Sequence, residues 1–468
     1  MQNIKAVKRR RPLKIALISI LALIVILVGA VLIFLRSSGI SLHSVNASQM
    51  RTMDFSDIEM YPPSIATDAL QLVRTVESTH PIFVLGDYLP ADYEAIRDEF
   101  LEIARSGDLT RQDFSFAILR YFSTLRDSHM SIGSAGRAGL QPFGGHLDIS
   151  WQVQDGQLFL LDGSTTTGEV IEIGGVPVAH VFAVTDRYWY AENTYELQAN
   201  RNNQSRLGDV IERAGGQINN GLVALTISDD GGISTINVQL DFDFDRFHVD
   251  FIIRHEMMED VFFIDLRVFS HGEHIIEVVE SIESAVANGT RKFIVDLRGN
   301  MGGATWVGQD LLGAMGITIP EFGSVRRTTG LAATHEEVGL WHMPILDFFG
   351  VDYSRMTPTV GTSSNPNNVF VSVLTDVETY SSATWMAVWV QDGGFGNIIG
   401  SPSRNAPTSF GHVVPYHLSY SNIWLSISID KWLRPDVNAD QLVLRPDILV
   451  NPDEALEVAL EYLHNLEN

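Results

Sequence analysis

The sequence FIVDLRGNMGG occupies residues 293–303 and indicates how the C-terminal half of the chain folds. An apolar run ends in Asp296, Arg298 and Asn300, and two glycines then lead into a helix-like segment, residues 304–315. A short apolar run followed by a turn and a helix is typical of a buried strand in an α/β sheet. Such sheets place their sites at the carboxyl ends of strands, so we expect this turn to be functional.

A second strand–turn–helix unit lies about seventy residues further along the chain. Residues 369–376 read VFVSVLTD, residues 380–383 read YSSA, and a helix-like segment covers 384–391. Ser381 and Ser382 stand where the strand gives way to the helix. A serine there can be a helix N-cap or an exposed nucleophile. We predict that the first turn supplies an oxyanion hole and the second supplies the nucleophile.

The rest of the chain divides into modules by its hydrophobic pattern. Residues 63–135 place apolar side chains at helical spacing and predict a helical cap domain. Residues 136–245 contain short strands and glycine turns, which predict a small β module. Residues 246–468 alternate strands with helices and predict an α/β core.

The N-terminus carries a membrane signal. Residues 15–35 are 21 consecutive uncharged, mostly aliphatic positions, enough to span a bilayer. Residues 1–14 are basic, which predicts a cytoplasmic N-terminus and an extracytoplasmic catalytic domain behind a stalk, residues 36–62. A cleaved signal peptide is the alternative, but the apolar run is long and ends in Ile-Phe-Leu-Arg rather than in small residues.

Composition excludes several classes of function. The chain has no cysteine, so disulfides, thiol nucleophiles and cysteine-ligated metals are ruled out. Removing the six basic residues before the apolar segment changes the formal net charge from −25 to −31, which argues against nucleic-acid binding. His335, Glu336 and His342 do not have the spacing of a zinc-binding H-E-x-x-H helix. We expect no metal and no cofactor.

Four stretches in this order resemble those of S41 peptidases, the group of the C-terminal processing proteases and the tricorn core. They are IVDLRGNMGGA (294–304), SSATWMA (381–387), RDSHM (126–130) and EVIEIGGVPV (169–178). They are similar, respectively, to the DLRxNxGG signature, the nucleophile segment, the D-x-H element that ends the helical cap, and a turn of the PDZ domain. The resemblance implies a ClpP/crotonase-like α/β core, a degenerate PDZ-like β module and a polypeptide substrate bound through its C-terminal end.

The resemblance also assigns site residues. Ser381 aligns with the nucleophile, and the N–H groups of Ser382 and Gly303 would form the oxyanion hole, with Gly302 as a substitute for Gly303. The three polar residues of the first turn, Asp296, Arg298 and Asn300, are interpreted as the frame that fixes that turn.

The general base follows from a departure from the family pattern. The processing proteases place a lysine about 25 residues after the serine, where this chain has Ala406. After residue 36 the chain contains two lysines, Lys292 and Lys431, and neither matches the motif. The tricorn-like branch uses a histidine preceded by a serine, which here is Ser128-His129. We therefore predict His129 as the base, with Ser128 in support.

The acid that orients the histidine is less well marked. The family places it about 55 to 60 residues past the serine, which favours Asp436 and leaves Asp440, or no acid at all, as alternatives. Thr384 also replaces a glutamate that the family usually has. The second hypothesis is therefore a catalytically impaired cell-surface protein that binds peptides. Ser428 to Lys431 matches S-x-x-K, but it lies in a strand-like alternation rather than at a helix start.

Overall fold

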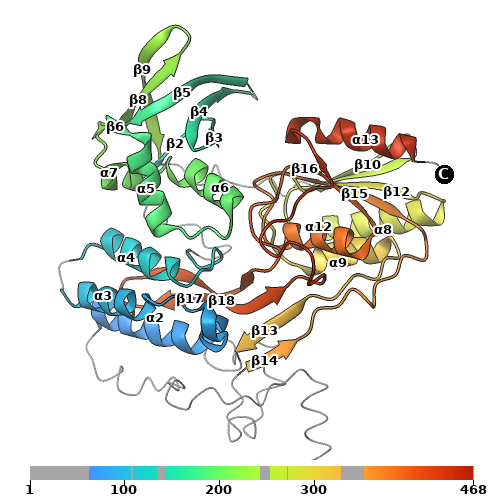
Figure 1. Cartoon of the computed structure of the whole chain (residues 1–468), viewed down its shortest axis with the longest axis horizontal. Coiled ribbons are helices and arrows are strands. Elements are labelled where there is room, and N and C mark those ends of the chain that lie inside the picture. The colour runs from blue at the N-terminus through green and yellow to red at the C-terminus, as the bar shows by residue number, and fades with distance from the viewer. Residues whose placement is uncertain are drawn as a thin grey trace, which may run out of the picture.

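The computed structural model describes residues 63–106, 109–133, 144–163, 165–242, 253–270, 272–327 and 353–466. These residues form a helical cap with its own sheet, a β module and an α/β core (Figure 1). The predicted transmembrane segment and stalk lie outside the described residues. Among those described, no helix has both the length and the apolar character needed to cross a bilayer.

The α/β core is a six-stranded sheet in the order β10-β11-β12-β15-β16-β19, parallel except for the edge strand β10. Its strands are β10 (Ile253–Met258), β11 (Val261–Leu266), β12 (Lys292–Asp296), β15 (Phe370–Thr375), β16 (Gly396–Gly400) and β19 (Ile448–Leu449). Its helices are α8 (Glu273–Ala287), α9 (Trp306–Ala314), α12 (Ser382–Gly393) and α13 (Ala455–Asn465), the last preceded by the 3₁₀ turn η5 (Pro452–Glu454).

The middle of strand β12, residues 293–295, is apolar because both faces of the sheet are covered. Phe293 and Val295 pack among the side chains of α8, α9 and α12. Ile294 points to the other face and packs under α13. The strands predicted from the two apolar runs, β12 and β15, are neighbours, so their carboxyl ends meet at one edge.

The cap consists of α2 (Ile65–Thr79), η1 (Pro81–Val84), η2 (Gly86–Tyr88), α3 (Tyr93–Arg105) and α4 (Arg111–Ser123). The side chain of Thr110 accepts the N–H of Asp113 and caps α4, a role that threonine often takes. Asp92 stands at the N-cap of α3 but makes no capping hydrogen bond through its side chain.

A five-stranded sheet completes the cap. It contains β1 (Ser131–Ile132), β13 (Gly323–Arg327), β14 (Tyr353–Met356), β17 (Phe410–Leu418) and β18 (Ile423–Leu433). Phe122 and Leu125 share a buried cluster with Leu425 and Ile427 of β18. Residues 246–468 therefore contribute strands to the sheet of the cap as well as to the α/β core.

The β module is an antiparallel sheet in the order β2-β9-β8-β5-β4-β3, to which β6 and β7 add short pairs. Its strands are β2 (His146–Leu147), β3 (Trp151–Gln154), β4 (Gln157–Asp162), β5 (Thr165–Ile173), β6 (Val176–Pro177), β7 (Ile218–Asn219), β8 (Leu222–Asp229) and β9 (Gly232–Asp241). Its helices are α5 (Val178–Tyr188), α6 (Thr194–Gln204) and α7 (Gly208–Arg213). The likeness to a PDZ domain stays a prediction.

Candidate active site

Ser381 stands immediately before α12 with φ 54° and ψ −123°. A residue with a side chain adopts this backbone at a cost of about 1–3 kcal/mol, and such strain is concentrated at functional sites. The strain is held by Asn405, whose Oδ1 accepts the Ser381 N–H at 2.7 Å. The same oxygen accepts the hydroxyl of Thr384 at 2.8 Å. Thr384, which stands where the family has a glutamate, therefore helps to fix the nucleophile loop.

The glycine turn after β12 packs directly against the serine. A Cβ on Gly302 would lie 2.8 Å from the Cβ of Ser381, so no larger residue fits there. The N–H of Gly302 donates to Asn300 Oδ1 at 2.8 Å and is not available to a substrate. Within the described part of the chain, the N–H groups of Gly303 and Ser382 donate to no acceptor. These two amides are the pair that the sequence predicts for the oxyanion hole, and Gly302 is not the substitute.

The polar residues of the turn form a rigid frame. Asp296 accepts the Nε–H of Arg298 at 2.9 Å and one of its terminal N–H groups at 2.6 Å. Asn300 is buried and donates to the carbonyl of Leu266 at 2.7 Å. Its own carbonyl accepts the N–H of Tyr380 at 2.9 Å, which ties the glycine turn to the nucleophile loop.

His129 reaches the serine from the cap. Its Nε2 lies 3.1 Å from Ser381 Oγ, although 252 residues separate the two in sequence. The loop after α4 is fixed by Asp127, whose Oδ1 accepts the backbone N–H of His129 at 2.7 Å. The imidazole stacks on Tyr380 with ring centroids 4.7 Å apart, and the Tyr380 hydroxyl lies 2.9 Å from the hydroxyl of Ser128.

Burial sets the protonation state of the histidine. It lowers the pKa of His129 to about 4, although the charge of Asp127 opposes the shift; Arg404 and Lys431 lower it further. The imidazole is therefore neutral at pH 7 and able to take a proton. Burial alone would raise the pKa of Asp127, but its hydrogen bond with His80, at 2.9 Å, and nearby positive charge bring that pKa below its usual value.

The structure does not place Asp436 beside His129. The N–H of Asp436 donates to Asp392 at 2.9 Å, near the C-terminal end of α12. Asp392 lies 11 residues beyond Ser381, about 16 Å along a helix. Asp440 lies nearby and accepts the N–H groups of Leu442 and Val443. The prediction of Asp436 as the orienting acid is therefore wrong, because distance along the chain does not place a loop in space.

Among the described residues, neither lysine contacts the serine hydroxyl; each has other partners. Lys292 pairs with Asp260 at 2.9 Å, at the opposite end of β12 from the glycine turn. Lys431 is buried in β18, with Nζ 4.3 Å above the ring of Phe410 and 3.4 Å from the carbonyl of Thr408. Burial lowers the pKa of Lys431. Ser428 is likewise buried in β18, so S-x-x-K is a strand, as the alternation predicts.

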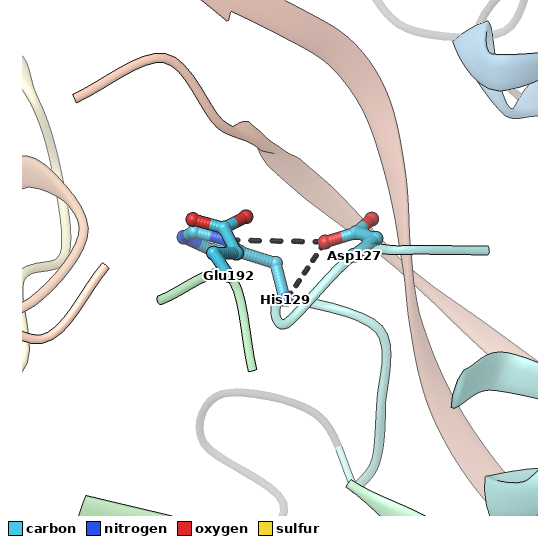
Figure 2. Close-up of side chains that lie close together, drawn as sticks. All are labelled: Asp127, His129 and Glu192. Carbon is cyan, nitrogen blue, oxygen red and sulfur yellow. Dashed lines mark hydrogen bonds and ion pairs between the residues drawn. The ribbon is translucent and has the colours of Figure 1, made fainter. Parts of the chain in front are cut away.

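A glutamate that no motif marks completes the surroundings of the histidine (Figure 2). Asp127, His129 and Glu192 each offer one ligand atom within 4.8 Å of the others. An imidazole and two carboxylates could in principle hold a divalent cation. His129 already faces Ser381 through Nε2, however, so the arrangement is that of an imidazole between two carboxylates and a serine hydroxyl. Asn405 was also missed from the sequence, since an asparagine in a loop gives no signal of what it contacts.

Comparisons with known proteins match the chain to one peptidase family and to several solved structures. Residues 260–450 match the model of peptidase family S41. The solved structure of mature CPAF complexed with lactacystin is 14% identical, with a TM-score of 0.60, and the match covers 86% of this chain and 97% of that one. Mature CPAF gives a TM-score of 0.58 at 14% identity, covering 86% and 95%. The photosystem II D1 C-terminal processing protease has a TM-score of 0.45 and 13% identity, and the match covers 84% of this chain and 94% of that one. Among curated proteins, none matches the chain significantly.

Proposed function

We propose that the chain, whose residues 260–450 match the model of peptidase family S41, is a serine-type peptidase of that family and cleaves polypeptides internally through an acyl-enzyme on Ser381. The observation that carries the proposal is the 3.1 Å contact between Ser381 Oγ and His129 Nε2. It joins a strained serine at a helix N-terminus to a neutral imidazole, which is the pairing that activates a hydroxyl.

In this mechanism His129 takes the proton of Ser381 as the hydroxyl attacks the scissile carbonyl. The developing oxyanion accepts hydrogen bonds from the N–H groups of Gly303 and Ser382, both of which lack an acceptor among the described residues. His129 then returns the proton to the leaving amine. Water then attacks the acyl-enzyme while His129 takes its proton. His129 returns that proton to Ser381 as the second product leaves.

We further propose that the enzyme acts outside the cytoplasm on a membrane anchor. The support is the apolar segment of residues 15–35 with its basic N-terminal flank. The β module would recognise the C-terminal end of a polypeptide by adding it as a strand to its sheet, which is a common mode of peptide binding.

The test uses the purified full-length protein with an unstructured polypeptide substrate and a serine-directed fluorophosphonate probe. Wild-type protein should cleave the substrate and be labelled at Ser381. Ser381→Ala should abolish both, and His129→Ala should lower kcat by about 10²–10⁴-fold. Cleavage by Ser381→Ala at the wild-type rate would refute the proposal. Unlabelled wild-type protein that still binds peptide would instead support the impaired peptide-binding hypothesis.

A further inference from the structure

Two buried polar atoms of His129 and its neighbour lack a hydrogen-bond partner among the residues that the structure describes. The side chain of His129 is 7% exposed, and its Nδ1 makes no hydrogen bond to any of them. Oε1 of Glu192 is buried and also makes none. Buried polar atoms in folded proteins are nearly always paired. One ligand atom of Glu192 lies within 4.8 Å of one of His129, so this carboxylate is a candidate acceptor for the imidazole.

Glu192 is held in place from three directions. Its Oε2 accepts the N–H of Ala406 at 2.8 Å, at the position where the processing proteases have their lysine. Its own N–H donates to Glu196 at 2.8 Å. The next residue, Asn193, caps α6 and donates to the carbonyl of Leu442 at 2.8 Å. The loop between α5 and α6 therefore presents Glu192 to the active site as a fixed group, with Oε1 as its remaining acceptor.

Asp127, the other carboxylate beside the imidazole, is already engaged. Its Oδ1 lies 3.9 Å from His129 Nδ1, too far for a hydrogen bond, and accepts the backbone N–H of His129 instead. Its Oδ2 faces His80. Asp127 thus fixes the loop and leaves Nδ1 to another acceptor.

We propose that Glu192 is the positioning residue of the catalytic histidine and accepts the Nδ1–H of His129 while Nε2 accepts the proton of Ser381. This inference rests on the proposed serine-peptidase function. The carboxylate would select the tautomer with a free Nε2 lone pair and would stabilise the imidazolium as it forms. Burial and the neighbouring Glu196 raise the pKa of Glu192 well above its usual value, and the charge of Lys431 opposes that shift. The acid is thus supplied by the β module rather than by the segment after the nucleophile.

The central variant is Glu192→Gln in the full-length protein. Glutamine keeps the shape and the oxygen that accepts the Ala406 N–H, but its NH₂ group faces Nδ1 and favours the wrong tautomer. We expect kcat to fall about 10²–10⁴-fold with KM changed less than about threefold, and labelling by fluorophosphonate to slow in parallel. Glu192→Asp should recover part of the lost rate. Glu212→Gln, an exposed glutamate of the same module, should match the wild type.

The outcomes separate this inference from the function on which it rests. Loss of activity in Ser381→Ala with wild-type kcat in Glu192→Gln would overturn the role of Glu192 and leave the serine mechanism standing. Loss in Glu192→Gln without recovery in Glu192→Asp, together with a lowered thermal midpoint, would also overturn it, since that pattern marks a purely structural residue. Loss of wild-type activity on treatment with EDTA would identify the cluster as a metal site instead.

Discussion

Glu196 is a buried carboxyl group that keeps its proton into the neutral range. Its side chain is 1% exposed, and this burial raises its pKa from 4.5 to about 7, although Arg404 opposes the shift. Between these two pH values the folded state binds more protons than the unfolded state. The contribution of Glu196 to stability is therefore complete below about pH 4.5 and is lost as the pH rises through 7.

A comparison of the wild type with Glu196→Gln isolates this effect, because glutamine does not titrate. We expect the free energy of unfolding of the wild type, relative to the variant, to fall by about 1–3 kcal/mol between pH 5 and pH 8. Urea unfolding at intervals across that range measures it. The titration of His129 is common to both proteins and largely cancels. If the stability of the wild type relative to Glu196→Gln instead rises with pH, the raised pKa of Glu196 is contradicted.

At the residue scale, the sequence reveals groups that belong to local motifs. Ser381 and His129 each stand in a short stretch with a recognisable neighbour, and the structure brings them to 3.1 Å. Asp436 was selected by its distance along the chain, and that distance does not determine where a loop lies. Glu192 and Asn405 stand in ordinary loops. Only the packing of the β module and of the segment after β16 places them at the site.

At the element scale, the turn after β12 depends on backbone shapes that only glycine adopts readily. Gly303 has φ 132°, and a Cβ there would lie 2.2 Å from the carbonyl oxygen of Phe269. Phe269 and Gly303 form a bridge that holds the turn, so the turn cannot move aside without breaking it. The amide proposed for the oxyanion hole therefore depends on a residue without a side chain.

Gly303→Ala should lower kcat more than 100-fold and destabilise the protein by several kcal/mol. Gly313 in α9 is the matched control, since a Cβ there would contact nothing within 4 Å. Gly313→Ala should raise the thermal midpoint slightly, because alanine is favoured in helices by about 1 kcal/mol. Thermal unfolding and steady-state kinetics of the two variants check this. If the two variants have the same kcat, the turn after β12 does not take part in the mechanism.

Element boundaries follow from the sequence where the pattern is local. The apolar run of residues 369–376 contains β15, and the helix-like segment of residues 384–391 lies within α12. Periodicity fixes such segments because each one has a buried and an exposed face, or is buried throughout. It does not say which distant strand covers a given helix. The association of β17 and β18 with the cap was accordingly not predicted.

At the scale of the whole molecule, we expect the cap and β18 to unfold as one unit, because they share one buried cluster. Leu425 lies in β18, is fully buried and shares its cluster with the helices α2 to α4. Leu425→Ala should cost about 2–5 kcal/mol and should increase hydrogen–deuterium exchange in residues 65–123, some 300 positions away in sequence. The activity of Leu425→Ala should also decline, because His129 lies in the loop that follows α4 of the cap.

Leu463→Ala provides the comparison. Leu463 is also fully buried, but it packs between α13 and the far face of the core sheet. Leu463→Ala should increase hydrogen–deuterium exchange in α13 and leave exchange in the cap helices unchanged. Identical exchange maps for the two variants would show that the cap is not a separate cooperative unit.

The order of the chain adds a consequence for biosynthesis. The ribosome makes His129 early, Ser381 much later, and β18, which buries the cap helices, later still. A nascent chain that has just exposed its serine therefore still lacks the strand that packs the cap and steadies the histidine. The peptidase should remain silent throughout most of its own translation, and chains truncated before residue 433 should be released without activity.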